Sequence, residues 1–322
     1  MICLYFDTDE FAFPLFIWLF YIAISSVLCY IQSSIGGGPM LEEYSFDDIY
    51  IRHAVDECPD GRNYTMHIHE RCEIYFFLSG NVEYLVEGSK YRLSEYSLMV
   101  MRPGELHTPR ILSDARYERY AINFPVSFGN AIDPEGRLMR PFCQRPLGKG
   151  NLFTASELDM GLVNRLFSEM GGHSDDYDRR LAVRAHLITL LDMINRAFCE
   201  KATAKHKPQS LGERMVQYVN RHLYEQLSVP ELAEHFYLST SQFRRVFQQA
   251  TGAAPWEYIT KKRLTAAKEK ILSGHSAHSA CEECGFGDYS AFYRAYTKHF
   301  GCPPKSDSGK ADLQRVRDGQ GN

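Results

Sequence analysis

The sequence lacks several features that mark common classes of enzyme and secreted protein. It contains no glycine-rich phosphate-binding loop and no convincing pairing of a nucleophile with a base. Its nine cysteines are an odd number without framework spacing, which indicates reduced thiols rather than a disulfide scaffold. A formal charge of −4 over 322 residues excludes a protein that coats nucleic acid with its whole surface.

Basic residues are absent from the start of the chain, where the first is Arg52, and this is unlike a signal peptide. Residues 11–31 carry no charge, and this run is long enough to cross a bilayer at ~1.5 Å per residue. One interpretation is therefore a membrane anchor. The favoured alternative is a mis-assigned start, because the glycines of residues 36–38 before Met40 are what a purine-rich ribosome-binding sequence encodes in frame. In that case we expect a cytoplasmic protein.

An internal repeat with a period of 49 residues lies in the C-terminal third of the chain, which is mildly basic. The repeat superposes Ser241, Phe243, Arg245, Gly252 and Pro255 on Ser290, Phe292, Arg294, Gly301 and Pro304. Each copy consists of a short predicted helix, a tight turn, a second helix and a closing Gly and Pro. This order is the plan of a helix-turn-helix unit.

The second helix of each copy has one apolar and one polar face. Ser239 and Asp288 stand at equivalent N-cap positions, and Ser239 with Gln242 has the spacing of a capping box. Arg and Gln side chains on such a helix can hydrogen-bond base edges in the major groove, while hydroxyls suit phosphates. The candidate DNA-binding residues are Ser241, Arg244, Arg245 and Gln248 in the first copy, and Ser290, Tyr293, Arg294 and Lys298 in the second.

A helix predicted over residues 257–272 connects the two copies. A rigid connection would fix the separation of the two second helices. Helices held ~34 Å apart would enter successive major grooves on one face of the duplex.

The run from Leu211 to Pro304 resembles the DNA-binding domain of the AraC/XylS family of transcription regulators. The resemblance rests on Leu232-Ala233, the helix from Ser239 to Gly252, Pro255, Tyr258, Arg263-Leu264, Ala267, Leu272, Cys284-Gly285-Phe286, Tyr289-Ser290, Phe292, Arg294, Phe300-Gly301 and Pro304. It implies double-stranded DNA and RNA polymerase as partners and a small-molecule effector, with carbohydrate as a family-level suggestion. It assigns base reading to six of the candidate residues: Ser241, Arg244, Arg245, Ser290, Tyr293 and Arg294. Arg245 and Arg294 could instead serve phosphates or intradomain ion pairs.

The part of the chain after Met40 has the pattern of short alternating strands, with strands predicted at 82–86, 97–101 and 117–124. This pattern favours a small β-sandwich or barrel. Two stretches, His67-Ile68-His69 to Glu73 and Pro103-Gly104-Glu105-Leu106-His107, resemble the two cupin motifs. The second motif departs from the cupin pattern, because Tyr96-Ser97 stands where cupins have Gly-Asp.

The candidate effector-binding residues are His67, His69, Glu73 and His107, and the same four residues are the candidate ligands of a divalent metal. On a continuous strand, 67, 69 and 73 would point to one face. A pocket for an organic effector without a metal is the favoured alternative. Tyr75, Tyr84 and Tyr120 are candidates to stack on a sugar-like ligand, or else belong to the core.

Two amphipathic helices are predicted between the domains, over 156–170 and 177–198. They either pack on the barrel or also form a homodimer interface. The Cys281 and Cys284 pair is interpreted as small apolar packing residues, with a zinc half-site as the alternative.

The predicted fold class is multidomain α+β, with a cupin-like barrel and following helices before an all-α domain of two helix-turn-helix units and a linking helix. The predicted divisions are an apolar extension (1–39), a ligand-binding domain (40–150), a helical segment (151–200), a linker (201–210), a DNA-binding domain (211–305) and a disordered tail (306–322). The rival function is a metal-dependent cupin enzyme, which has no need of two helices that display Ser and Arg at matched positions. The sequence leaves open whether a regulator would activate or repress.

Overall fold

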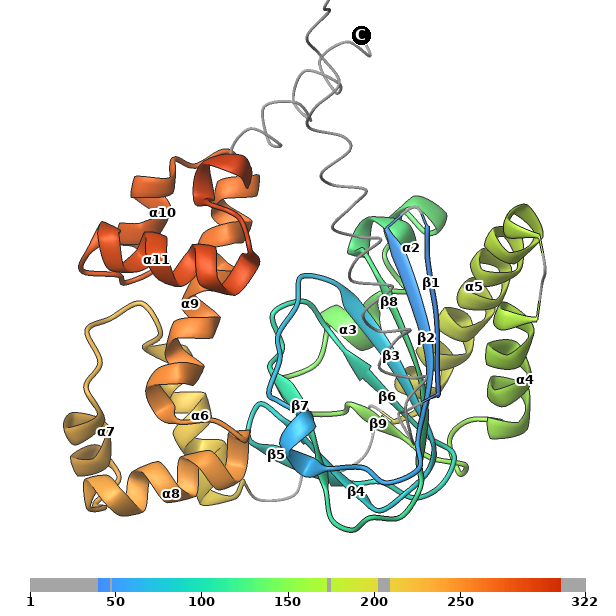
Figure 1. Cartoon of the computed structure of the whole chain (residues 1–322), viewed down its shortest axis with the longest axis horizontal. Coiled ribbons are helices and arrows are strands. Elements are labelled where there is room, and N and C mark those ends of the chain that lie inside the picture. Colours follow the sequence, from blue (N-terminus) through green and yellow to red (C-terminus); the bar gives the residue numbers. More distant parts are fainter. Residues whose placement is uncertain (1–39, 47, 173–174, 202–208, 308–322) are drawn as a thin grey trace, which may run out of the picture.

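The computed structural model describes residues 40–46, 48–172, 175–201 and 209–307 (Figure 1). A β-rich part precedes an all-helical part, as the sequence predicts. The strands are β1 (Met40–Phe46), β2 (Ile49–Asp56), β3 (Cys72–Ser79), β4 (Val82–Val86), β5 (Ser89–Arg92), β6 (Ser97–Met101), β7 (His107–Ile111), β8 (Tyr117–Phe124) and β9 (Leu152–Phe153). The helices are α2 (Val126–Ile132), α3 (Arg140–Cys143), α4 (Met160–Gly171), α5 (Asp176–Lys201), α6 (Leu211–Arg221), α7 (Val229–His235), α8 (Thr240–Thr251), α9 (Pro255–Leu272), α10 (Ala277–Glu283) and α11 (Tyr289–Phe300).

The strands form two antiparallel sheets that enclose a pocket. The larger sheet has the order β1-β2-β8-β3-β6-β9 and the smaller has the order β5-β4-β7. A single bridge between His67 and His107 adds the segment before β3 to the edge of the smaller sheet. The three strands predicted from alternation are confirmed at their predicted bounds.

Strand β3 is buried on both faces, because the sheet separates two apolar cores. Its Ile74 and Phe76 belong to the core under the helices, whereas Tyr75 and Phe77 belong to the core inside the barrel. Successive side chains of a strand point to opposite faces, so a strand between two cores is largely apolar on both faces, and Glu73 is the charged exception in β3.

Helices α4 and α5 cover the outer face of the larger sheet (Figure 1). Phe167 of α4 stacks on Phe76 of β3 with ring centroids 5.5 Å apart, and Leu187 and Ile194 of α5 are fully buried in the same core. The predicted intramolecular packing of these helices is therefore confirmed.

The helical part has two cores that share α9. Tyr258 and Ile259 at the start of α9 pack with α6, α7 and α8, whereas Leu264 and Ile271 farther along pack with α10 and α11. Cys281 and Cys284 are buried in the second core, which confirms their interpretation as packing residues. The linking helix is therefore a structural member of both helix-turn-helix units.

The caps of the two second helices match as the repeat predicts. Ser239 forms a capping box with Gln242 at the start of α8, and Asp288 accepts from the Ser290 N–H at the start of α11. At their C-termini, Gly252 and Gly301 adopt left-handed φ values of 81° and 71°. A residue with a Cβ is strained in this conformation, which explains why the repeat retains glycine there.

The described structure continues past residue 305, where the sequence predicts the start of a tail. Asp307 is fully buried, and its carboxylate accepts a hydrogen bond of 2.8 Å from the Tyr296 hydroxyl. The expectation of disorder from residue 306 is therefore wrong for Ser306 and Asp307, because the buried Asp307 carboxylate accepts hydrogen bonds from Tyr296 and Cys302.

Three predictions fall outside the described residues: the apolar extension 1–39, most of the linker (202–208) and the tail beyond residue 307. Among the helices of the described ranges, none combines the length and the apolar character that a membrane span requires.

Candidate functional site

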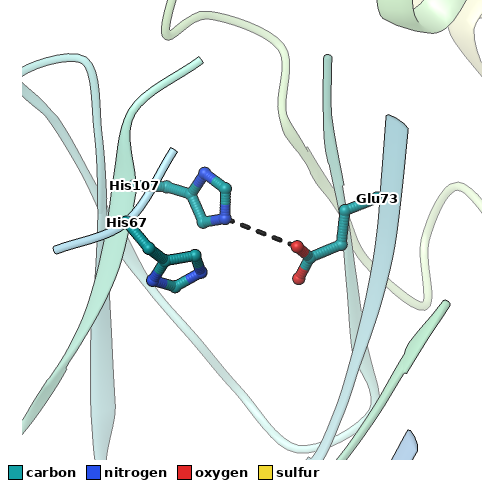
Figure 2. Close-up of side chains that lie close together, drawn as sticks. All are labelled: His67, Glu73 and His107. Carbon is teal, nitrogen blue, oxygen red and sulfur yellow. Dashed lines mark ion pairs between the residues drawn. The ribbon is translucent and has the colours of Figure 1, made fainter. Parts of the chain in front are cut away.

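Three of the four candidate ligand residues converge inside the barrel. One ligand atom from each of His67, Glu73 and His107 lies within 4.8 Å of the other two (Figure 2). His69 lies beside this group, and its Nε2 is 2.7 Å from Oε2 of Glu73. The close-up shows the two imidazoles on one side of the pocket and the Glu73 carboxylate facing them from β3.

The convergence does not arise as the sequence predicts. Strand β3 begins only at Cys72, so His67 and His69 precede it and do not share a continuous strand with Glu73. The backbone bridge between His67 and His107 brings the first histidine into place instead. The expected alternation is wrong, although the residues it selected do meet.

The ring orientation of each histidine is set by a backbone carbonyl. The Nδ1 atoms of His67, His69 and His107 lie 3.1, 2.8 and 2.7 Å from the carbonyl oxygens of Thr65, Arg71 and Glu105. A carbonyl oxygen only accepts, so Nδ1 carries the proton and Nε2 faces the cluster. The Nε2 of His107 is fully buried and has no hydrogen-bond partner among the described residues, although it lies 3.4 Å from the Glu73 carboxylate.

The electrostatics of this cluster follow from burial and close contact. Burial would raise the pKa of Glu73, but the adjacent imidazoles of His107 and His69 outweigh it and hold that pKa well below its usual range. Burial would lower the pKa of His107, but Glu73 raises it. His67 presents one edge to solvent, yet the surrounding protein desolvates it and, together with the charge of His107, lowers its pKa to about 4.

A cavity of about 370 Å³ adjoins the cluster within the barrel. His67 and Glu73 line it at one end, and Tyr75 and Tyr84 form part of its wall. Tyr120 points the other way, because it stacks on Phe167 beneath the helices with ring centroids 5.2 Å apart. Of the three tyrosines proposed for ligand stacking, two are therefore in the pocket and the third belongs to the outer core.

The sequence did not identify the other residues of the pocket wall, among them Arg52, Tyr64, Tyr117 and Arg119. Tyr117 and Arg119 share a face of β8 with Ala121, and this parity is the only signal that could have found them. The signal is weak because Glu118 and Tyr120 on the opposite face are also polar, so alternation does not reveal which face is inside.

The eight candidate DNA-binding residues all have exposed side chains. Four lie on α8 and four on α11, the second helices of the two units (Figure 1). Arg244, Arg245 and Arg294 form no ion pair with any residue of the described ranges. The alternative that Arg245 and Arg294 serve intradomain ion pairs is therefore not supported.

A buried arginine holds the two units together. Arg263 of α9 donates from Nε to the carbonyl of Leu223 and from Nη2 to that of Glu225, at 2.7 and 2.6 Å, beside the first unit. Its Nη1 donates to the carbonyl of Gly285 in the second unit at 2.7 Å. The planar guanidinium therefore fixes how α8 and α11 are placed relative to each other.

The barrel and the helical part share a polar and apolar interface. Glu87, at the turn after β4, is buried and accepts from the amide of Asn220 at 3.1 Å and from the hydroxyl of Tyr258. Its other carboxylate oxygen lies 2.8 Å from both Lys262 Nζ and the backbone N–H of Leu106. Two barrel residues, Met66 and Leu106, also belong to the core of the first helix-turn-helix unit.

A pocket-bearing β domain followed by paired helix-turn-helix units is the class of protein that this fold and these sites define. A family model described as an AraC-like ligand binding domain matches residues 53–191, and one described as a helix-turn-helix domain matches residues 232–307. Together they identify both halves of the molecule, and the chain belongs to the AraC family.

Three relatives illustrate the extent of the similarity. The probable transcriptional regulator LumQ of Photobacterium leiognathi is 30% identical over 145 residues, which cover 44% of this chain and 56% of LumQ. The thermoregulatory protein LcrF of Yersinia pestis is 22% identical over 73% of this chain and 88% of LcrF. The crystal structure of the DNA-binding domain of AdpA with a target DNA matches 35% of this chain and all of that domain, at 28% identity and a TM-score of 0.31. The chain spans about half the length of the first of these curated relatives.

Proposed function

We propose that this protein is a sequence-specific DNA-binding transcription regulator whose two helix-turn-helix units read DNA under the control of a small molecule in the barrel. The observation that carries the proposal is the matched pair of capped, solvent-exposed helices, α8 and α11, built on one shared helix. Each presents Ser and Arg at equivalent positions, Ser241 with Arg245 and Ser290 with Arg294. Such helices can read successive major grooves.

A salt titration of the full chain on the DNA around its own gene tests the proposal, with Arg245→Ala and Arg294→Ala beside the wild type. We expect each change to weaken specific binding ~5- to 100-fold, because one good base contact contributes about 1–3 kcal/mol. Affinity should also fall steeply with salt. Arg196→Ala is the matched control, because Arg196 carries the same charge on the exposed face of α5. Equal affinity of all four proteins would refute two working readers.

The barrel is the proposed effector site, in which His67 and Glu73 line the cavity and His69 and His107 contact Glu73 beside it. The same group fits a divalent cation, because two inward Nε2 atoms and one carboxylate form a nitrogen and oxygen donor set. The buried Nε2 of His107, which lacks a hydrogen-bond partner among the described residues, supports this fit. His67, Glu73 and His107 would hold the ion, and His69 would orient the carboxylate.

Metal binding is tested by titrating the apo protein with zinc, nickel and manganese and measuring the bound stoichiometry. We expect one ion per chain in the wild type and loss of binding in His107→Ala. His278→Ala, at an exposed site on α10, serves as the control. Retained stoichiometry in His107→Ala would show that any metal lies elsewhere, and no ion in the wild type would leave the cavity to an organic effector alone.

Coupling between the pocket and the DNA-binding units is proposed to run through the edge where β4 meets β7. Glu87 and Leu106 are hydrogen-bonded in both directions, and His107 of the pocket follows directly. A ligand that displaces His107 would therefore also move Leu106, which is hydrogen-bonded to Glu87. Such control requires different effector affinities for the two domain arrangements.

Homodimer formation through α5 is a further part of the proposal. Leu181 and Ile188 lie two turns apart on its outer face and are 58% and 36% exposed, an apolar stripe at helical spacing. Light scattering should report a dimer for the wild type and a monomer for Leu181→Glu, while Thr189→Glu on the same helix remains dimeric. A monomeric wild type would refute the dimer. RNA polymerase as a partner and action in the cytoplasm are proposed from family membership.

A further inference from the structure

The pocket contains a guanidinium that lacks an anionic partner. Arg119 projects from β8 into the cavity, and among the described residues its one hydrogen bond is a 3.5 Å contact with the Tyr117 carbonyl. The charged group lies over the rings of Tyr117 and Tyr64, 4.1 and 5.3 Å from their centroids. Within the described ranges, no carboxylate comes within ion-pair distance of it. Removing an arginine from water without a carboxylate is costly, so the site favours an anion.

The neighbouring charges reinforce this end of the pocket. Arg52 on the adjacent strand β2 also lines the cavity. Its Nε forms an ion pair with Glu43 at 3.5 Å but has no hydrogen-bond partner among the described residues. Asp56, a carboxylate near this end, is occupied by the Tyr64 hydroxyl at 2.6 Å and by a backbone N–H. Two cationic side chains, Arg52 and Arg119, therefore face this end of the cavity. No carboxylate of the described ranges forms an ion pair with Arg119.

The opposite end of the cavity carries a negative charge, the carboxylate of Glu73. The contacts of Glu73 with His69, Asn123 and His107 go to its Oε2 atom. Its second oxygen remains able to accept a hydrogen bond from a ligand. An anion at this end would be repelled by Glu73, whereas a hydroxyl could donate to it.

We propose that the pocket binds a small hydroxylated organic acid, whose carboxylate pairs with Arg119 and whose hydroxyl donates to Glu73. The inference rests on the proposed function of the barrel as an effector site and specifies its ligand class. The planar guanidinium provides two parallel N–H donors for a carboxylate, and such charge-assisted pairs are the strongest hydrogen bonds of ligand recognition.

The dimensions of the pocket limit the ligand to a compact acid. Phe77 pairs with Arg119, and Glu73 pairs with Asn123 on the same two strands. Arg119 and Glu73 are therefore offset along the sheet by four residues, which is about 13 Å of strand. The long arginine side chain reaches into this distance, and the 370 Å³ cavity is near the lower limit of ligand sites. The rings of Tyr75 and Tyr84, with centroids 4.8 Å apart and planes inclined at 53°, provide an aromatic wall for a sugar ring or another compact ring.

The experiment is isothermal titration of the full chain with matched compounds: uronic acids, the corresponding neutral hexoses, cyclohexanecarboxylate and inorganic phosphate. We expect a uronic acid to bind at least ~10-fold more tightly than its neutral hexose and than the acid without hydroxyls. Phosphate, which tests for general anion binding, should bind no better than cyclohexanecarboxylate. Equal binding of acid and neutral sugar, equal binding of phosphate, or no binding of any uronic acid would each overturn the proposal.

Variants separate recognition from folding. Arg119→Gln should weaken binding of the acid ~10- to 100-fold, and Arg119→Lys should restore part of it because the charge remains. Arg116→Gln is the control, since Arg116 is exposed and paired with Glu57 outside the cavity. Circular dichroism of each variant confirms that it is folded. Unchanged binding in folded Arg119→Gln would overturn the assignment.

DNA binding is measured separately on the same proteins, which distinguishes this inference from the proposed function. An acid that binds through Arg119 while the protein ignores DNA would contradict the regulator and leave the ligand class intact. Specific DNA binding without any response to the acids would contradict the ligand class alone.

Discussion

Lys262 of the linking helix lies 2.8 Å from Glu87 of the barrel, and their side chains are only 10% and 1% exposed. This ion pair joins residues 175 positions apart in the sequence. Tyr258 and Asn220 complete the hydrogen bonds of the same carboxylate, so its charge is buried but satisfied. A buried pair of this kind stabilises one relative position of two domains, because a partly separated arrangement leaves a charge without its partner.

Glu87→Gln is expected to loosen the contact between barrel and helical part. Loss of one partner of a buried pair costs about 3–5 kcal/mol, and here that energy belongs to the interface rather than to either domain. We expect a larger radius of gyration in small-angle scattering, with unchanged far-UV circular dichroism. Glu283→Gln breaks the exposed pair with Lys270 within one unit and is the control. An unchanged radius in Glu87→Gln would contradict the role of this carboxylate.

Gly252→Ala and Gly301→Ala form a second, matched test. Both glycines have positive φ, so each change carries a backbone strain of about 1 kcal/mol. A Cβ on Gly301 meets open space, whereas a Cβ on Gly252 would lie 2.8 Å from the Thr108 methyl in the barrel. Gly252→Ala should therefore lower the melting temperature in thermal unfolding more than Gly301→Ala does.

Thr108→Ser removes this methyl group. The double variant Thr108→Ser with Gly252→Ala should therefore lose no more stability than Gly301→Ala does. If Thr108→Ser brings no recovery, the contact between helix and barrel is not the cause.

Arg263→Lys is expected to disturb the spacing of α8 and α11 while leaving each helix intact. A lysine cannot reproduce the three carbonyl contacts that Arg263 makes in both units, and each buried carbonyl left unpaired costs about 1–3 kcal/mol. Binding to DNA with two half-sites should weaken ~10-fold or more, while binding to DNA with one scrambled half-site should change little. Arg221→Lys, at an exposed position on α6, is the control. An equal loss on both DNAs would point to general unfolding instead.

Glu105→Gln should reveal a stability term that depends on pH. Glu105 is buried against Arg145 and also accepts from the Gly148 N–H and the Asn151 amide. Burial raises the pKa of Glu105, but these contacts outweigh it and the net pKa is lowered. The carboxylate therefore contributes stability above its unfolded pKa of about 4.3, and the contribution is lost as the pH falls through the folded value.

In urea unfolding at pH 7, the free energy of unfolding of the wild type should exceed that of Glu105→Gln by about 3–5 kcal/mol. The difference should stay constant down to about pH 5 and shrink below about pH 4. Glu135→Gln, which alters an exposed pair with Arg137, should show no such trend. A difference that is independent of pH would mean that the charge of Glu105 contributes nothing.

Local signals were sufficient wherever one element decides the outcome. The alternation at 97–101 and 117–124 defined two strands at their observed bounds, and Ser239 and Asp288 marked the helix starts. Side-chain period and cap chemistry depend on neighbours within a few residues, so they can be read without the fold. The prediction failed at His67 and His69, where a backbone bridge rather than a strand positions the residues.

The sequence by itself determined the repeated helix-turn-helix units, the exposed polar faces of their second helices and the residue types of the histidine and carboxylate cluster. Only the tertiary structure decided that Arg119 enters the pocket, that Tyr120 does not, and that Glu87 meets Lys262. These outcomes depend on which face of a strand is turned inward and on contacts between segments far apart in the chain. Periodicity indicates whether a residue belongs to a helix or a strand. Its contact partner across a sheet or a domain interface is set by packing.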